Sequence, residues 1–141
     1  MVVRDVASLY QARAAGIQVE KQLDPDLPLV NADPDLLVRA VSNLVANAID
    51  TMSEGGTLHL RTLRRDNDAV IEIEDSGPGI TEEQKARLFT PYFTTKPGGT
   101  GLGLAIVQGI ASDHGGRVEV RPASPHGTIF ALVLPIAAPA P

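Results

Sequence analysis

Apolar residues recur along the 141-residue chain with two periods, one typical of helices and one typical of strands. Helical spacing predicts helices over residues 3–15, 33–52, 81–88 and 101–114. Alternation of apolar and polar residues predicts strands over residues 17–23, 57–65, 69–75, 117–121 and 128–134, with a short extended piece over 29–32. Asp33 before Pro34 is typical of a helix start, and the glycine pair at 115–116 is typical of a helix end.

The strand pattern also predicts how the elements are layered. Ile71 and Ile73 alternate with Glu72 and Glu74, so this strand has one apolar face. A sheet covered by helices on both faces would instead have nearly continuous apolar strands. We therefore expect an α/β fold, a two-layer sandwich in which helices cover one face of a mixed sheet. Residues 1–136 are expected to form one domain, and residues 137–141 a disordered tail.

Composition and charge exclude several classes of protein. The chain has no cysteine and a formal net charge of −5, which excludes disulfides and thiolate metal sites and argues against a nucleic-acid partner. No apolar run reaches the roughly 20 residues that a membrane-spanning helix needs, and the first residues do not resemble a signal peptide. We expect a cytoplasmic domain, whose parent protein could still be anchored in a membrane. A polyanionic ligand would have to be held by local donors.

A polar stripe follows the helix predicted over residues 33–52. Its members are Arg39, Asn43, Asn47 and Asp50, at spacings of four, four and three, so they share one helix face. The simplest interpretation is a solvated face. Asparagine is a mediocre helix former, however, and its amide oxygen suits Mg²⁺, which combines few protein oxygens with phosphate oxygens and water. Both interpretations stay open on this stripe alone.

An acidic residue followed by glycines ends the strand predicted over residues 69–75. Asp75 shares a face with Ile71 and Ile73, the face expected to lie in the core. A carboxylate there needs hydrogen-bond donors, and an adenine amino group would be one. Gly77 and Gly79 would let the backbone approach a flat ring. The alternative is an ordinary glycine turn after a strand.

A second glycine-rich segment precedes the helix predicted over residues 101–114. Unpaired amides and the dipole at such a helix start suit phosphate binding, although no Gly-Lys-Ser/Thr of a Walker loop is present. A plain glycine connector is the alternative. Lys96, just upstream, could meet a terminal phosphate or simply be solvated. Thr128 points inward and could bond a ligand or be a satisfied core threonine.

The order and spacing of five segments resemble those of sensor histidine kinases, most closely of the nitrogen-regulation branch. Residues 43–48, 75–79, 88–96, 99–104 and 127–128 resemble the N-box, first glycine box, F-box, second glycine box and final Gly-Thr of that family. The family belongs to the superfamily of gyrase, Hsp90, histidine kinase and MutL ATPases, so the resemblance implies a Bergerat (GHKL) fold. It covers nearly the whole chain, from about residue 3 to residue 135.

The resemblance implies a role for each matching residue. Asn47 would ligate Mg²⁺, Asn43 would support the phosphates, and Asp75 would accept the adenine amino group. Gly77, Gly79 and Ile80 would shape the base pocket, and Thr128 would support Asp75 through its hydroxyl or a water. The phosphates would be held by Thr100, Gly101, Leu102, Gly103 and Leu104, with Lys96 as a point charge and Phe93 as an anchor of the ATP lid, residues 90–99.

The implied activity is transfer of the γ-phosphoryl group of Mg-ATP to a histidine, in two-component signalling. The hydrolytic relatives carry a glutamate where Asn43 stands, and an amide cannot act as a base near neutral pH, so hydrolysis should be slow. Asp50 stands where many members have a lysine. None of His59, His114 and His126 lies in a phosphoacceptor context; all three occupy ordinary surface positions. The chain should bind ATP but not phosphorylate itself.

The partners implied are a dimerisation domain of the same parent protein, which carries the phosphoacceptor histidine, and indirectly a response regulator. The chain itself is expected to be monomeric and the parent homodimeric. Two alternatives remain: an anti-sigma-factor serine kinase of the same superfamily, and a non-catalytic nucleotide-sensing module. The first fits less well because those kinases tend to keep the glutamate that Asn43 replaces. The second would use the same binding groups, so only a transfer assay separates it.

Overall fold

The computed structural model describes residues 17–24, 33–52, 55–87 and 103–136. Several predictions fall outside these residues: the helix over 3–15, the extended piece over 29–32, the lid, most of the second glycine box and the tail. The proposed domain limits, 1–136 and 137–141, also stay a prediction.

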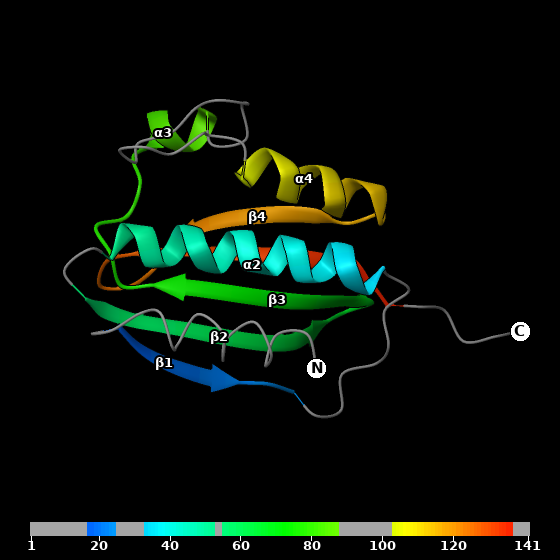
Figure 1. Ribbon diagram of the computed structural model, residues 1–141, viewed down its shortest axis with the longest axis horizontal. Helices are drawn as coiled ribbons and strands as arrows, with labels where there is room; N and C mark the ends of the chain where they lie inside the picture. The colour runs from blue at the N-terminus through cyan, green and yellow to red at the C-terminus, as the bar shows by residue number, and fades with distance from the viewer. Residues whose placement is uncertain (1–16, 25–32, 53–54, 88–102, 137–141) are drawn as a thin grey trace, which may run out of the picture.

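A five-stranded mixed sheet forms the first layer of the described residues (Figure 1). The strands are β1 (Ile17–Gln22), β2 (Gly56–Arg65), β3 (Asp68–Asp75), β4 (Arg117–Pro122) and β5 (Thr128–Pro135). They lie in the order β1-β2-β3-β5-β4, with β1 parallel to β2 and the other neighbouring pairs antiparallel. The predicted strands and the mixed character of the sheet are confirmed. The register places Asp75 opposite Leu58 on one side and opposite Thr128 on the other.

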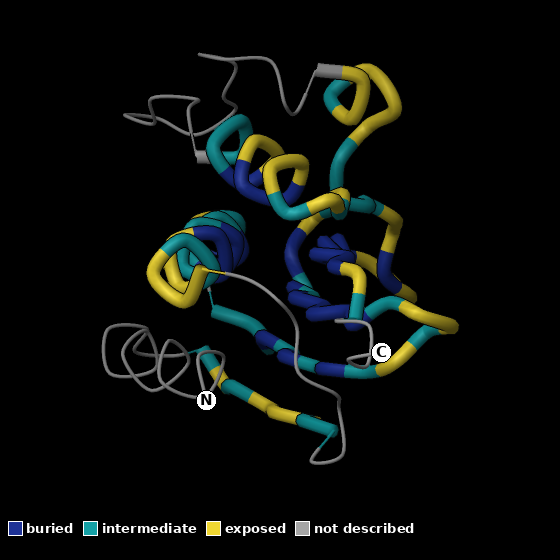
Figure 2. Tube along the Cα trace, turned by 90° about the vertical axis from the view of Figure 1, so that its right-hand side faces the viewer, coloured by how far each residue is buried: buried dark blue, intermediate teal, exposed yellow. Residues whose placement is uncertain are grey.

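Helices α2 (Pro34–Thr51) and α4 (Gly103–Asp113) form the second layer on one face of the sheet (Figures 1 and 2). The short α3 (Glu82–Arg87) lies beyond the start of α4 (Figure 1). The buried apolar side chains between the layers are Ala40, Val41, Leu44, Val45 and Ala48 of α2, Val107, Ile110 and Ala111 of α4, and Leu58, Leu60, Ile71, Ile73, Phe130, Leu132 and Leu134 of the sheet. The predicted two-layer sandwich is therefore confirmed. No helix in the described ranges is long and apolar enough to cross a bilayer.

Local signals start and end the helices where the sequence predicts. The Asp33 carboxylate accepts hydrogen bonds from the first amides of α2, and Pro34 follows it. Thr81 and Gln84 cap α3 reciprocally, each accepting the other's backbone N–H at 3.0 Å. After α4, Gly115 has a φ of 75° and Gly116 donates to the Ala111 carbonyl at 2.8 Å, which is a Schellman ending.

The sheet face opposite the helices is less polar than the alternation suggested. Val70, Ala131 and Val133 form a small buried apolar cluster there. Beside it, Glu72 of β3 is only 6% exposed, and one arginine on each side of β3 pairs with it. Arg61 of β2 donates at 3.0 Å and Arg121 of β4 at 2.6 Å.

These arginines change the acidity of Glu72. Burial raises the pKa of its carboxyl, but the hydrogen bonds and charges of Arg121 and Arg61 outweigh burial, so the pKa lies below the ordinary value of 4.5. A lowered pKa in the folded state means that the ionised group stabilises the fold. That stabilisation is present above the unfolded pKa and is lost as the pH falls through the folded pKa.

We therefore expect Glu72→Gln to lower the free energy of unfolding at pH 7 by roughly 1.5–3 kcal/mol, the range for hydrogen bonds to charged groups. The difference from the unchanged chain should shrink at pH 3, which lies below the ordinary pKa of 4.5. Urea unfolding at both pH values measures this, with the exposed Glu83→Gln as the control. An equal difference at pH 7 and pH 3 would show that the charge of Glu72 does not matter.

Candidate functional site

The predicted acid, Asp75, lies at the end of β3 on the helix-covered face and is only 2% exposed. Its Oδ1 accepts the backbone N–H of Gly77 at 2.9 Å. Further hydrogen bonds come from the backbone of Thr128 and the hydroxyl of Thr51. The Thr51 hydroxyl also lies 2.8 Å from the Ala48 carbonyl, and since it carries one proton it can donate to only one of the two acceptors at a time. The carboxylate is therefore buried with few donors of its own.

This environment makes Asp75 easier to protonate than an ordinary aspartate. Burial raises its pKa most strongly, the hydrogen bonds from Gly77, Thr128 and Thr51 offset part of the rise, and the nearby charge of Glu74 adds to it. A buried carboxylate with a raised pKa gains from any further donor that approaches it. Such a group is suited to a ligand that brings its own N–H.

The loop after Asp75, residues 76–80, is called the glycine loop here, and it is anchored to the end of α2 and the start of β2. Ser76 Oγ accepts the backbone N–H of Thr57 at 2.9 Å and lies 3.6 Å from the sulfur of Met52. Gly77 packs against Thr51: an added Cβ would lie 3.0 Å from the Thr51 carbonyl oxygen. Gly79 has a φ of 85°, which other residues adopt only with strain. The close contact at residue 77 and the positive φ at residue 79 thus each favour glycine for a structural reason.

The loop between β4 and β5 supports this glycine loop from the other side. Gly127 has a φ of 112°, and an added Cβ would collide with the backbone carbonyl of Asp75. His126 donates from Nδ1 to the Gly77 carbonyl at 3.1 Å. The sequence predicts an ordinary surface position for His126, so its contact with the site was missed. The only signal available was its place just before the Gly127-Thr128 pair.

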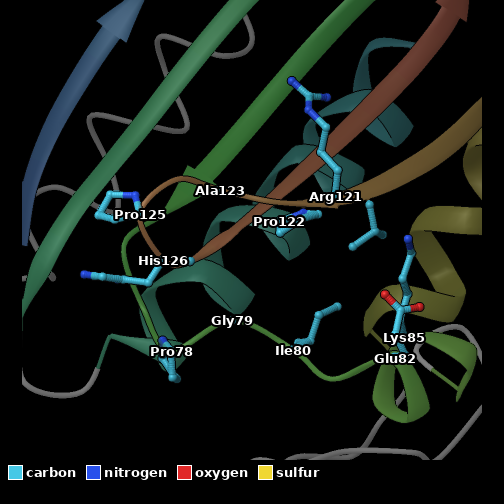
Figure 3. A pocket seen from close by; sticks show the side chains of 12 residues that line it. Pro78, Gly79, Ile80, Glu82, Lys85, Arg121, Pro122, Ala123, Pro125 and His126 are labelled. Atoms are coloured by element: carbon cyan, nitrogen blue, oxygen red, sulfur yellow. The ribbon is translucent and has the colours of Figure 1, made fainter.

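A pocket lies along the glycine loop (Figure 3). It is lined by Pro78, Gly79 and Ile80 of that loop, Glu82 and Lys85 of α3, and residues 120–123 and 125–127 around the end of β4. The predicted base-pocket residues Gly79 and Ile80 therefore share one wall. Asp75, Asn43 and Asn47 do not line this pocket. The glycine loop thus has one side on the pocket and its base beside Asp75.

The polar stripe of α2 divides into two pairs. Asn43 and Asn47 are half-buried one turn apart, whereas Arg39 and Asp50 are exposed. The C-terminal half of α2, the end of β3 and the first turn of α4 lie toward the same end of the molecule (Figure 1). The structure thus gathers at one end the two asparagines, the buried acid and the helix start that begins with Gly103 and Leu104.

Five predicted site residues lie outside the described part of the chain: Phe93, Lys96, Thr100, Gly101 and Leu102. Their roles rest on the motifs alone. Gly103 and Leu104 open α4 as expected, and Thr128 opens β5 opposite Asp75. The hydrogen bond that Thr128 makes to Asp75 comes from its backbone, and a role for its hydroxyl stays a prediction.

Comparison with known proteins decides the family. Residues 32–138 match the family described as histidine kinase-, DNA gyrase B- and HSP90-like ATPases. The chain belongs to this ATPase family. The match covers all of the fold from α2 to β5, including every described residue of the site. ATP binding by this domain follows from its membership.

Within the family, the similar proteins are histidine kinases. The sensor histidine kinase ZraS of Salmonella typhimurium is 41% identical over 128 residues, which cover 90% of this chain and 28% of ZraS. The mycobacterial sensor histidine kinase MprB has a TM-score of 0.85 and 34% identity, and the match covers 95% of this chain and 91% of that structure. Full-length ShkA in complex with AMPPNP has a TM-score of 0.87 and 31% identity, covering 99% of this chain and 30% of ShkA.

These findings confirm the resemblance drawn from the five motifs, and with it the ATPase domain of a histidine kinase as the class of enzyme. The ATPase domain spans little more than a quarter of the length of ZraS.

Proposed function

We propose that this ATPase domain binds Mg-ATP and donates the γ-phosphoryl group to a histidine on a separate dimerisation domain of its parent protein. The observation that carries the proposal is the buried carboxylate of Asp75, which lies beside a glycine loop and at the same end of the fold as Asn43, Asn47 and the start of α4. This acid is 2% exposed and has a raised pKa, although Gly77, Thr128 and Thr51 donate to it. A ligand with an N–H would supply a further donor.

The base end of the site fits adenine. A carboxylate has about four lone-pair positions, and Gly77, Thr128 and Thr51 fill at most three of them, so Asp75 can accept the adenine amino group as well. We assign Gly77, Gly79 and Ile80 to the walls of the base pocket, and Thr128 to the support of Asp75. These glycines are held by contacts with Thr51 and Gly127, so their backbone is in place before a ligand arrives.

The phosphate end fits a triphosphate with a divalent cation. We assign the amide oxygen of Asn47 as an Mg²⁺ ligand and Asn43 as a phosphate contact, since Mg²⁺ prefers few protein oxygens together with phosphates and water. The unpaired amides at the start of α4, from Gly103 and Leu104, and its helix dipole would face the phosphates. On the motif resemblance, Thr100, Gly101 and Leu102 extend this cradle, Lys96 supplies a positive charge, and Phe93 anchors the lid.

The proposed acceptor is an imidazole rather than water. ATP supplies the phosphoryl group, and phosphoryl transfer depends mainly on positioning and charge neutralisation. Asn43 cannot take a proton from water, so the domain holds the triphosphate without activating hydrolysis. The partners are then the dimerisation domain of the same parent and, one step later, a response regulator. We place the domain in the cytoplasm, as a monomer by itself and within a homodimeric parent.

Radiolabelled ATP tests the proposal. We expect the chain alone to remain unlabelled with [γ-³²P]ATP and Mg²⁺, because none of its three histidines lies in a phosphoacceptor context. Addition of the parent's dimerisation domain, prepared separately, should produce acid-labile label on that domain. Transfer should fail when its acceptor histidine is replaced by glutamine.

Two other outcomes would each contradict the proposal. Stable label on a histidine of the chain alone would show that the acceptor lies within these residues. Tight ATP binding without transfer to the supplied domain would indicate a nucleotide-sensing module.

A further inference from the structure

His114 lies just after α4 and contacts two elements at once. Its Nδ1 is 2.7 Å from the Ile110 carbonyl oxygen of its own helix. Its Nε2 is 3.1 Å from the backbone nitrogen of Asp33, the N-cap of α2, which is 81 residues away in sequence. The sequence predicts a histidine at a helix end on the surface, and the half-buried His114 does follow α4, but its contact with Asp33 was missed. The imidazole joins the end of one helix to the beginning of another.

The two partners determine where the ring carries its proton. A carbonyl oxygen only accepts, so Nδ1 must be protonated to bond Ile110. A backbone N–H only donates, so Nε2 must be unprotonated to bond Asp33. Only the neutral ring with its proton on Nδ1 makes both bonds. Asp33 makes hydrogen bonds through both its side chain and its backbone. Its carboxylate accepts the Asp35 and Leu36 amides, and its own N–H donates to His114.

The bridge lies at the opposite end of the helix pair from the proposed phosphate site. Helices α2 and α4 share one buried core and run in opposite directions (Figure 1). The 11 residues of α4 correspond to a rise of roughly 16 Å. The same rise from Asp33 along α2 ends near Leu44, between Asn43 and Asn47. The bridge therefore defines how far along α2 the first turn of α4 lies.

Building on the proposed function, we propose that His114 is a positioning residue, which keeps the first turn of α4 level with Asn43 and Asn47. The two helices carry the two halves of the phosphate site. The apolar contacts between them are non-directional, whereas a hydrogen bond requires a defined distance and angle. Asp75 lies on β3, and the loop after it packs against Thr51 at the end of α2, so the base end of the site does not depend on the position of α4. Loss of the bridge should thus weaken contacts to the phosphates and spare those to adenine.

The test compares ATP with adenosine. We expect His114→Ala to weaken binding of Mg-ATP by about threefold to tenfold, the equivalent of one hydrogen bond, while its affinity for adenosine stays unchanged. His114→Gln should behave like the unchanged chain, because its side-chain oxygen can accept the Asp33 N–H. His59→Ala is the matched control, since His59 lies on the opposite face of the sheet, paired with Glu20. Titration calorimetry for ATP and NMR titration for adenosine measure the affinities, at a temperature where circular dichroism shows each variant folded.

A spectroscopic readout is independent of any nucleotide. Nitrogen NMR of the unchanged chain should show that the neutral His114 ring carries its proton on Nδ1. A proton on Nε2 would overturn the inference, as would equal ATP affinities of the unchanged chain and His114→Ala. A parallel loss of ATP and adenosine binding in His114→Ala would overturn it too, because that is the result of general loosening. Failure of the unchanged chain to bind ATP would instead overturn the proposed function, and this inference with it.

Discussion

Replacement of Asp75 by asparagine should reduce the affinity for ATP more than tenfold, which corresponds to about 1.4 kcal/mol or more. The amide keeps the shape of the side chain but loses the charge that accepts the adenine amino group, and a buried pairing is lost. The same substitution should not lower the stability of the nucleotide-free domain. A loss of binding without a loss of stability would show that Asp75 serves ligand binding and not the stability of the fold.

The sign of the stability change follows from the raised pKa of Asp75. A carboxyl whose pKa is higher in the folded than in the unfolded state favours folding when it is protonated. That contribution is complete below the unfolded value of 3.8 and is lost as the pH rises through the folded value. At pH 7 the ionised form of this group therefore destabilises the fold. Asp75→Asn removes this destabilisation, so the melting temperature at pH 7 should be unchanged or higher.

Titration calorimetry with ATP and with ITP, which lacks the amino group, measures the first effect. The unchanged chain should prefer ATP, and Asp75→Asn should lose most of this preference. Glu74→Gln is the matched acid-to-amide control, because the adjacent Glu74 lies on the opposite sheet face and pairs with Arg61. Retention of tight, ATP-selective binding by Asp75→Asn would refute the assignment of the adenine contact.

Replacement of Gly127 by alanine should destabilise the domain by roughly 3 kcal/mol or more, the combined cost of a strained φ and of overpacking. Gly127 has a φ of 112°, and a Cβ there would collide with the backbone carbonyl of Asp75. The melting temperature should fall by roughly 10 °C for a domain of this size. Nucleotide binding should weaken as well, because the collision displaces the glycine loop beside Asp75.

Gly109 provides the control for this experiment. It lies in the middle of α4, and an added Cβ would meet nothing within 4 Å. Gly109→Ala should therefore stabilise the domain by about 0.5–1 kcal/mol through helix propensity. Thermal unfolding followed by circular dichroism compares the two variants. Equal melting temperatures for Gly127→Ala and Gly109→Ala would show that the approach of Gly127 to Asp75 is not tight.

The sequence predicted the features that depend on near neighbours in the chain. Asp33 and Pro34 start α2, and Gly115 and Gly116 end α4, because caps act within one turn of a helix. Asp75 was expected on the inner face because the side chains of a strand alternate with a period of two. The asparagine stripe needed only the helical period. Motif order then identified the family, and the family comparison confirmed it.

The tertiary structure alone decided which distant residues meet. The strand order β3-β5-β4 brings Arg121 to Glu72, 49 residues away, and buries an acid that alternation places on the outer face. The register of β3 against β5 sets Gly127 against the backbone of Asp75. The packing of α4 on α2 brings His114 within hydrogen-bonding distance of Asp33, 81 residues away. Periodicity and caps are local properties of a chain, whereas these contacts depend on strand order and helix packing, which no short segment contains.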